Sequence, residues 1–433
     1  MFRRRGSRGR GCASSRRGGS VIAMHVAYIH QHFSTRKGAT GTRSYEMARA
    51  LIGAGHRVTM ICGVNDATAA CFDVRRRVNE TQIDGIDVVC IAERYGNRMG
   101  FIRRIRAFLG FARTAQRVLR DLDADLIFAT STPLTVGLPA MKASRRKRVP
   151  FVFEVRDRWP EVAIALGMLR NPLLIAYAQR MERRIYRAAD RVIALSPGMK
   201  DGVCSTGYPD ERVAVIPNGS DVDLFQPTTA KSTDERFGDP DDLRLVFTGA
   251  HGLANGLDAV LAAAALLQRR GEEGIRFVFI GEGGQKERLI ERSRREGTAG
   301  LIRWLDSMPK DDLARVLPQL DVGLMVLKNV PAFHHGTSPN KFFDYIAAGL
   351  PVLNNYPGWL ADRIRENECG IVVAPDDAEA FADAVVWMRD HRDELREMGR
   401  RGRRLAEREF ARPLLAERFV GVLEGAYGAD RRQ

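Results

Sequence analysis

Hydrophobic and polar residues alternate with two different periods along most of this chain. From Met24 onward, short apolar runs such as HVAYIH and RVTMICG flank a segment, TRSYEMARALIGAGH, in which apolar residues recur at helical spacing. Similar apolar runs follow at DLIFAT, VPFVFEV and RVIALS. Short apolar strands that alternate with amphipathic helices are typical of a parallel sheet covered on both faces. The pattern therefore predicts a doubly wound α/β domain.

A second series of the same kind follows a break in the pattern. After VAVIPNG comes a polar stretch, and then LRLVFTG, RFVFIG, DVGLMVL, LPVLNN and CGIVVA alternate with helical segments. We predict two Rossmann-like domains, residues 24–216 and 243–427, joined by a linker at 217–242. The helices of residues 377–427 are expected to complete the second domain and could return to brace the first. Ligands of such sheets bind beyond the carboxyl ends of the strands, so the site is expected in the cleft between the domains.

Composition adds a basic extension and excludes some classes of protein. Of the net charge of +15, residues 1–23 contribute seven arginines and no acid, in a Gly/Ser/Arg-rich stretch that predicts disorder. This segment could be an extension without function, a basic arm for membrane or nucleic acid, or a transit peptide. The six cysteines lack metal-ligand spacing, and no apolar run approaches the ~20 residues of a membrane span. We expect reduced thiols and a cytoplasmic protein.

One predicted helix, residues 101–120, carries an unusual charge pattern. It holds six arginines and no acid, beside an apolar stripe of Phe101, Ile105, Phe108, Ala112, Ala115 and Leu119. Two readings are open: a core-facing helix with a solvated basic face, or a helix lying against an anionic membrane surface. The basic run at residues 145–148 favours the second, so we predict peripheral association with the inner face of the plasma membrane.

The stretch GTSPNKFFDYIAAGLPVLNN, residues 336–355, predicts an anion site. Ser338 is a good helix cap, so the helix is expected to start near Pro339. Free N–H groups at a helix start favour a phosphate, and Lys341 adds a full charge. Asp344, one turn later, could accept hydrogen bonds from sugar or ribose hydroxyls. The alternative is an ordinary capped helix of an α/β protein.

The strings EVRDRWPE, GAHGLANGLDAVL and TSPNKFFDYIAAGLPV resemble retaining glycosyltransferases of family four, closest to those of O-antigen and capsule synthesis that use N-acetylated amino sugars. The resemblance covers about residues 24–427. It implies a GT-B fold and transfer of an N-acetylated amino or deoxy sugar from a UDP-sugar. The implied acceptor is a polyprenyl-diphosphate-linked or other glycan of bacterial surface polysaccharide. No metal is expected, because a helix terminus with Lys341 can replace the cation.

The same resemblance, and two departures from it, assign the candidate residues. The family's Glu-x7-Glu pair falls on Gly336 and Asp344, and Ala250 and Asn255 stand where relatives carry Arg and Lys on the donor phosphates. Backbone groups and Lys341 must then do more of the binding. The expected donor-binding residues are Gly38, Gly41, Gly249, His251, Gly336, Thr337, Ser338, Asn340, Lys341 and Asp344, with Asp157 and Lys341 as catalytic residues.

Alternatives remain for two of these residues and for the function. His251 could be a structural loop residue, and Asp157 could only pair with Arg156 at the end of its strand. The loop KGATGTRSYE, which holds Gly38 and Gly41, lacks the GxGxxG spacing of a dinucleotide binder. A UDP-N-acetylglucosamine 2-epimerase would need a pattern of acids and histidines that is absent. A nucleic-acid-binding protein would need a basic track with stacking aromatics, so no nucleic acid partner is expected.

Overall fold

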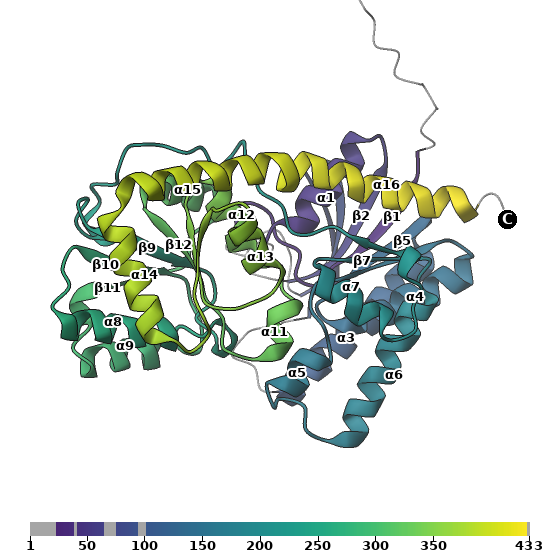
Figure 1. The fold of residues 1–433 in the computed structure, drawn as a ribbon. Coiled ribbons are helices and arrows are strands. Elements are labelled where there is room, and N and C mark those ends of the chain that lie inside the picture. Colours follow the sequence, from purple (N-terminus) through teal and green to yellow (C-terminus); the bar gives the residue numbers. More distant parts are fainter. Residues whose placement is uncertain (1–22, 39–40, 65–74, 94–100, 431–433) are drawn as a thin grey trace, which may run out of the picture.

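Two parallel sheets lie side by side in the computed structural model, which describes residues 23–38, 41–64, 75–93 and 101–430 (Figure 1). The predicted α/β architecture of two Rossmann-like domains, the GT-B fold, is confirmed. Residues 1–22, with nearly all of the predicted basic extension, lie outside the described residues. In the described part of the chain, no helix has both the length and the apolar character needed to cross a bilayer.

The first sheet has the strand order β3-β4-β2-β1-β5-β6-β7-β8 and is parallel except for β3. Its strands are β1 (His25–Ile29), β2 (Arg57–Gly63), β3 (Val78–Ile83), β4 (Ile86–Ile91), β5 (Leu126–Thr130), β6 (Phe151–Val155), β7 (Arg191–Ala194) and β8 (Val213–Val215). The helices between them are α1 (Arg43–Gly53), α3 (Phe101–Asp121), α4 (Gly137–Lys147), α5 (Glu161–Ala165), α6 (Pro172–Ala188) and α7 (Pro197–Cys204).

The second sheet has the order β11-β10-β9-β12-β13-β14, with every pair parallel. Its strands are β9 (Leu243–Thr248), β10 (Ile275–Ile280), β11 (Ile302–Leu305), β12 (Val322–Met325), β13 (Val352–Asn354) and β14 (Gly370–Val372). The helices that follow its strands are α8 (Asp258–Arg270), α9 (Lys286–Arg295), α10 (Lys310–Val316), α11 (Pro331–His335), α12 (Asn340–Ala347), α13 (Trp359–Glu366), α14 (Ala378–Asp390), α15 (Arg392–Leu405) and α16 (Arg412–Asp430).

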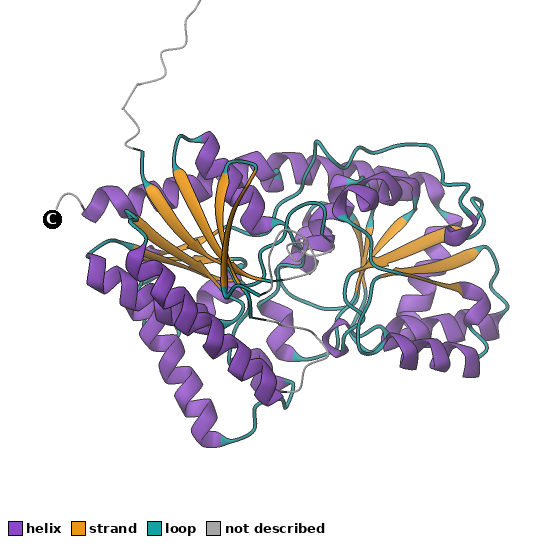
Figure 2. Cartoon of the chain, turned by 180° about the vertical axis from the view of Figure 1, so that it is seen from behind, coloured by secondary structure: helices purple, strands orange, loops and turns teal. Residues whose placement is uncertain are grey.

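Helices cover both faces of each sheet, as the continuous apolar strands require (Figure 2). In the first domain, α3, α4 and α6 pack on one face, and α1 and α16 pack on the other. Helix α16 crosses from the second domain to reach that position (Figure 1). Its residues therefore contribute to the core of the first domain, which is the second of the two placements that the sequence left open for residues 377–427.

The apolar stripe of α3 differs from the predicted one. Ala112, Ala115 and Leu119 are buried as expected, but Ile105 is exposed and Phe111 supplies the fully buried ring. The side chain of Phe101 lies outside the described residues. The stripe is rotated because α3 packs on both β4 and α4, which moves the buried side toward Phe111. The arginines at 103, 106, 113, 117 and 120 are exposed, so the basic face is real.

Candidate functional site

A pocket of about 260 Å³ opens between the two domains, and we call it the interdomain pocket. The carboxyl ends of β1, β5 and β6 supply one wall, and the loop before α12 supplies the other. The first-domain residues that line it are His30, His32, Gly41, Thr132, Arg156, Asp157, Leu195 and Asn218, and the second-domain residues are Ser338, Pro339 and Asn340. Four predicted residues therefore meet here: Gly41, Asp157, Ser338 and Asn340.

A chain of hydrogen bonds holds the first-domain wall in place. The Ser44 hydroxyl lies 2.8 Å from His30 Nδ1, and Arg156 Nη1 lies 3.1 Å from His30 Nε2. Burial, with the charge of Arg156, lowers the pKa of His30 well below its usual value and that of His32 to about 4. Both imidazoles are therefore neutral at physiological pH, and Arg156 is the cation of this wall.

Asp157 faces the interdomain pocket and accepts a hydrogen bond from Thr132 Oγ1 at 3.0 Å. The surrounding protein desolvates the carboxylate and raises its pKa, while the Thr132 hydroxyl and Arg156 act in the opposite direction. The structure shows no ion pair between Arg156 and Asp157 in the described residues, since Arg156 is directed toward His30. Asp157 therefore presents its carboxylate to whatever enters the pocket.

A buried ion pair supports this wall from below. Arg43, at the start of α1, donates to Glu154 at 2.8 and 2.9 Å, and both side chains are fully buried. Arg43 also donates to the carbonyls of Ile216 and Pro217. These residues begin the segment 216–221, which leads into the second domain and which we call the crossover. Removing one partner of such a pair would leave an uncompensated buried charge, so the pair fixes α1, β6 and the crossover in one arrangement.

The helix beside the second-domain wall begins one residue later than predicted. Helix α12 starts at Asn340, and Ser338 does not cap it. Ser338 instead accepts a hydrogen bond from the Asn218 N–H at 3.1 Å, while its carbonyl accepts one from Asn218 Nδ2 at 2.6 Å. Asn340 lies against Gly41, where an added Cβ would come within 2.7 Å of Asn340 Nδ2. Gly41 thus leaves room for the Asn340 side chain, which a larger residue would displace.

Lys341 lies at the carboxyl end of β9, as the predicted phosphate site requires. Its Nζ lies 3.2 Å from Asn255 Oδ1 and 3.8 Å from the centre of the Phe247 ring. Burial lowers the pKa of Lys341 to about 7. Gly249, whose φ of +125° favours glycine, would place a Cβ only 3.5 Å from Lys341 Cε. An anion bound here would restore the full charge of Lys341.

His251 is buried in the loop that follows β9. Its ring is fully buried among Phe247, Phe279 and Trp304, with ring-centroid distances of 5.7 to 6.2 Å. Burial, helped by two nearby lysines, lowers its pKa to about 4. Neither ring nitrogen has a hydrogen-bond partner among the described residues, so a part for His251 beside the donor phosphates stays a prediction.

Asp344 is already paired, which changes its expected part in the site. Its Oδ1 lies 3.2 Å from Lys310 Nζ, and Lys310 also pairs with the buried Asp221. Arg412 completes the group by donating to both Asp221 oxygens. Burial opposes charge on Asp221, but Arg412 and Lys310 hold its pKa well below the usual range. We call Asp221, Lys310, Asp344 and Arg412 the hinge cluster, since it joins the crossover, α10, α12 and α16.

The remaining candidates have packing contacts. The Gly38 N–H donates to the Thr35 carbonyl at 3.0 Å, and Gly38 is not among the residues that line the interdomain pocket. An added Cβ on Gly336 would lie 3.1 Å from Arg158 Cδ, so this glycine packs against the first domain. The Thr337 carbonyl accepts a hydrogen bond from Trp359 Nε1 at 2.7 Å. These three residues shape the loops beside the site.

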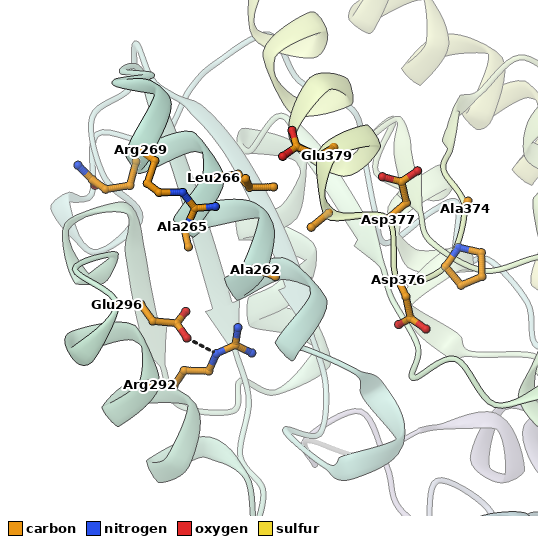
Figure 3. A pocket seen from close by; sticks show the side chains of 13 residues that line it. Ala262, Ala265, Leu266, Arg269, Arg292, Glu296, Ala374, Asp376, Asp377 and Glu379 are labelled. Atoms are coloured by element: carbon orange, nitrogen blue, oxygen red, sulfur yellow. Dashed lines mark hydrogen bonds and ion pairs between the residues drawn. The ribbon is translucent and has the colours of Figure 1, made fainter.

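A larger hollow, of about 980 Å³, lies outside the cleft (Figure 3). It is open to solvent between α8, α9 and the start of α14. Arg292 and Glu296 pair with each other at 2.8 Å on its wall, and Asp376, Asp377 and Glu379 make the opposite side acidic. None of the predicted site residues lines it, and its acidic side disfavours a nucleotide phosphate.

Two family models match the chain over most of its length. Residues 38–219 match the glycosyl transferase 4-like domain, and residues 242–391 match the glycosyl transferases group 1. Residues 220–241, between the two matches, belong to neither. The chain therefore belongs to the group 1 glycosyltransferases of family four, and it is a glycosyltransferase that uses a nucleotide-sugar donor.

Curated relatives are similar at 24–25% identity. An MMP alpha-(1->4)-mannosyltransferase of Mycolicibacterium hassiacum is 25% identical over 63% of this chain and 63% of its own length, so the match spans under two thirds of that relative. A GDP-mannose-dependent alpha-(1-6)-phosphatidylinositol monomannoside mannosyltransferase of Mycobacterium tuberculosis is 24% identical over 72% of this chain and 78% of its own. A putative colanic acid biosynthesis glycosyl transferase of Escherichia coli is 25% identical over 46% of this chain and 49% of its own.

Solved structures share the fold at lower identity. Sucrose-phosphate synthase from Thermosynechococcus elongatus superposes with a TM-score of 0.73 at 15% identity, covering 94% of this chain and 99% of its own. Anabaena HepE, solved with UDP-glucose, superposes with a TM-score of 0.65 at 15% identity, covering 93% of this chain and 100% of its own. These likenesses support the GT-B architecture.

Sequence reasoning missed several residues of the first-domain wall. His30, His32 and Thr132 were not predicted, and Arg156 was considered only as a partner of Asp157. A signal for the histidines was present, because the HQH triplet directly follows β1. The carboxyl end of a parallel strand is where ligands bind, so polar residues there are candidates. Lys310 left no comparable signal.

Proposed function

We propose that this enzyme transfers a sugar from a UDP-sugar to a lipid-linked or other glycan acceptor, with retention of the anomeric configuration. The observation that carries the proposal is the arrangement of the interdomain pocket. Asp157 and Arg156 line one wall, and the start of α12 forms the opposite wall. A cation on α12 suits a diphosphate, while a carboxylate opposite suits sugar hydroxyls. No metal is needed in this arrangement.

Lys341 and the first N–H groups of α12 would stabilise the leaving diphosphate. As the bond from the anomeric carbon to the diphosphate oxygen breaks, negative charge grows on that oxygen. The acceptor hydroxyl oxygen then bonds to the anomeric carbon from the same face, and its proton passes to the departing diphosphate. Asp157 and Arg156 would hold the sugar during this exchange.

The hinge cluster is the group that we expect beside the nucleoside. Asp344 alone was predicted to bind the ribose, but its Oδ1 is already shared with Lys310. We propose that ribose hydroxyls meet the Asp344–Lys310 pair, which offers both an acceptor and a donor. This would place the diphosphate of the donor at Lys341, one helical turn before Asp344.

The donor and acceptor are narrowed by chemistry and by similarity. We propose an N-acetylated amino or deoxy sugar, on the strength of the TSPNKFFDYIAAGLPV and EVRDRWPE strings. One relative is named for GDP-mannose, and one structural neighbour was solved with UDP-glucose. GDP is therefore the nucleotide to compare with UDP. A polyprenyl-diphosphate-linked glycan of surface polysaccharide is the proposed acceptor. The exposed arginines of α3 would hold the enzyme at the anionic cytoplasmic face of the membrane.

Isothermal titration with UDP, GDP and ADP tests the proposal. The protein is titrated in EDTA and then in magnesium, and the titration is repeated on Lys341→Ala. We expect UDP to bind without metal and Lys341→Ala to weaken it. Lys286→Ala is the matched control, because Lys286 is a partly buried lysine of the same domain that is paired with Glu282 and Asp306. Failure of every nucleotide to bind would contradict the proposed function.

A further inference from the structure

Exposed apolar side chains gather at one point on the first domain. Of the large hydrophobic residues that are exposed in the described part of the chain, most lie within ten consecutive positions. They are Met168 at 47%, Leu173 at 79%, Leu174 at 48% and Tyr177 at 66% exposure. We call these four residues the tip patch. Exposing such a cluster to water is unfavourable, and contiguous exposed apolar surface marks an interaction site.

The tip patch lies on a helix that leaves the body of the protein. Helix α6 projects from the domain beside α5, as both views show (Figures 1 and 2). Its fully buried residues, Ile185 and Tyr186, both belong to the last turns, whereas the first turns are mostly exposed, with Ile175 half-buried. The helix start is nevertheless well formed, because Asn171 accepts hydrogen bonds from the N–H groups of Leu173 and Leu174, and Pro172 follows the cap.

A basic flank runs beside the tip patch. Its exposed members are Arg170, Arg180, Arg183, Arg184 and Arg187, and none of them forms an ion pair within the described residues. The acid of α6, Glu182, does not neutralise the basic flank, since its carboxylate accepts a hydrogen bond from the Tyr186 hydroxyl at 3.0 Å. Burial also raises the pKa of Glu182 to about 7. Apolar side chains with adjacent arginines are typical of a helix that lies in a membrane interface.

We propose that the tip patch inserts into the interfacial region of an anionic lipid bilayer, with the basic flank bound to lipid headgroups. Leucine side chains enter the acyl boundary, tyrosine sits at headgroup level, and arginine contacts lipid phosphates. Insertion of the tip patch would add an apolar contact to the electrostatic one proposed for α3, on which Ile105 is exposed in the described residues. A second copy of the chain is a poorer occupant. A two-fold contact would bring the unpaired arginines of both copies together, and four side chains cover much less than the roughly 800 Å² per partner of a stable interface.

The position of the tip patch relative to the site gives it a purpose. Asp157 is followed by α5, then Met168, then α6, so the tip is continuous in sequence with one wall of the interdomain pocket. Helix α5 also contacts α11, which directly precedes the loop that forms the other wall. Insertion would therefore hold the mouth of the pocket near the bilayer surface. This part of the inference rests on the proposed function, since it assumes an acceptor whose diphosphate group remains attached to a membrane lipid.

Vesicle flotation tests the proposal with the full chain. The vesicles contain phosphatidylcholine with or without phosphatidylglycerol, and the test variant is L173Q/L174Q/Y177Q, since glutamine keeps helix propensity. Wild type is expected to float with the phosphatidylglycerol vesicles, and the variant to bind them at least about tenfold more weakly. Leu253→Gln is the matched control, because Leu253 is 51% exposed on the second domain. It should bind like wild type.

A second measurement separates insertion from surface attraction. A tryptophan placed by Leu173→Trp should shift its emission to the blue and be quenched by brominated lipids. Vesicle binding without quenching, or equal binding by the triple variant and wild type, would overturn the proposal. So would a wild-type dimer, measured by light scattering, that the triple variant converts to monomer, because the patch would then belong to a second copy. UDP titration without vesicles on the same variants keeps this result independent of the proposed function.

Discussion

The two walls of the interdomain pocket are built in opposite ways. The first-domain wall is rich in side chains that hold each other: Ser44 with His30, His30 with Arg156, and Thr132 with Asp157. The second-domain wall consists of Ser338, Pro339 and Asn340 at the start of α12. The next residue, Lys341, contacts an amide oxygen and an aromatic ring. A fixed network suits recognition of sugar hydroxyls, whereas a desolvated cation suits a charge that grows during reaction. Under the proposed function, the first wall would orient the sugar, and the start of α12 with Lys341 would hold the leaving group.

The strongest test of this division is Lys341→Ala. We expect the rate of sugar transfer to fall about 10²–10³-fold, because the charge that stabilises the leaving diphosphate is lost. The rate is measured with the donor that the nucleotide titration selects, and Lys286→Ala should stay close to wild type. A Lys341→Ala enzyme with unchanged kcat would show that the second wall does not carry the leaving group.

The hinge cluster keeps the walls in register, so Arg412→Leu should destabilise the protein. Asp221 would keep only Lys310, and we expect a loss of about 3 kcal/mol in urea unfolding at neutral pH. The native pKa of Asp221 is depressed, so this stabilisation is present above the unfolded pKa of about 4 and is lost as pH falls toward the native value. The gap between wild type and variant should therefore narrow in acid.

Arg418→Leu is the control for the hinge, because Arg418 is an exposed arginine of the same helix that donates to the Val215 carbonyl. It is expected to change stability by less than about 0.5 kcal/mol. Similar losses in both variants would argue against a special contribution from the hinge cluster.

Asp157→Asn probes the other wall. Loss of a charged hydrogen-bond acceptor for the sugar should lower transfer about 10- to 100-fold while leaving UDP affinity unchanged. Asp210→Asn, an exposed acid of the same domain paired with Lys200 at 2.8 Å, should have little effect. Weakened UDP binding by Asp157→Asn would mean that the first wall also holds the diphosphate, and the contrast between the walls would fail.

The pH dependence of UDP binding gives a finer test. Lys341 has a pKa of about 7 because it is buried, and a bound diphosphate must raise that pKa. The affinity for UDP should therefore fall by up to about tenfold per pH unit above pH 7, until the pKa of the complex is reached. Titration from pH 7 to more alkaline values measures it, and Lys341→Arg should remove the dependence because arginine keeps its charge.

The sequence was sufficient for the fold because each strand and helix is specified locally. Runs such as LRLVFTG form β9 as a single buried strand, and glycine after helices marks their ends. Local signals were also enough to bring Lys341 to the end of β9, since α12 must follow β12 in the same sheet. What failed were predictions that depended on a partner far along the chain.

Ser338 and Asp344 illustrate this limit. Ser338 has the side chain of a helix cap, but its hydroxyl accepts a hydrogen bond from the N–H of Asn218, 120 positions away, and the helix starts at Asn340. Asp344 was expected to accept hydrogen bonds from sugar or ribose hydroxyls, and the sequence did not show that Lys310 pairs with its carboxylate. The aromatic rings around His251 also come from distant parts of the chain, so the sequence did not show that its ring is buried. Tertiary contacts override a local preference wherever their energy is larger.

The crossing of α16 has a consequence for handling the two domains. Leu415, Phe419 and Leu423 are fully buried against the first sheet, with Phe419 5.1 Å from the Phe128 ring. A chain cut after Ala411 would expose the apolar side chains of β1 and β5 to water. A separate first domain would lack α16, which covers this part of its core. Neither half can be produced as a simple fragment. A first domain for expression on its own would have to be circularly permuted, with residues 412–430 fused ahead of Met24.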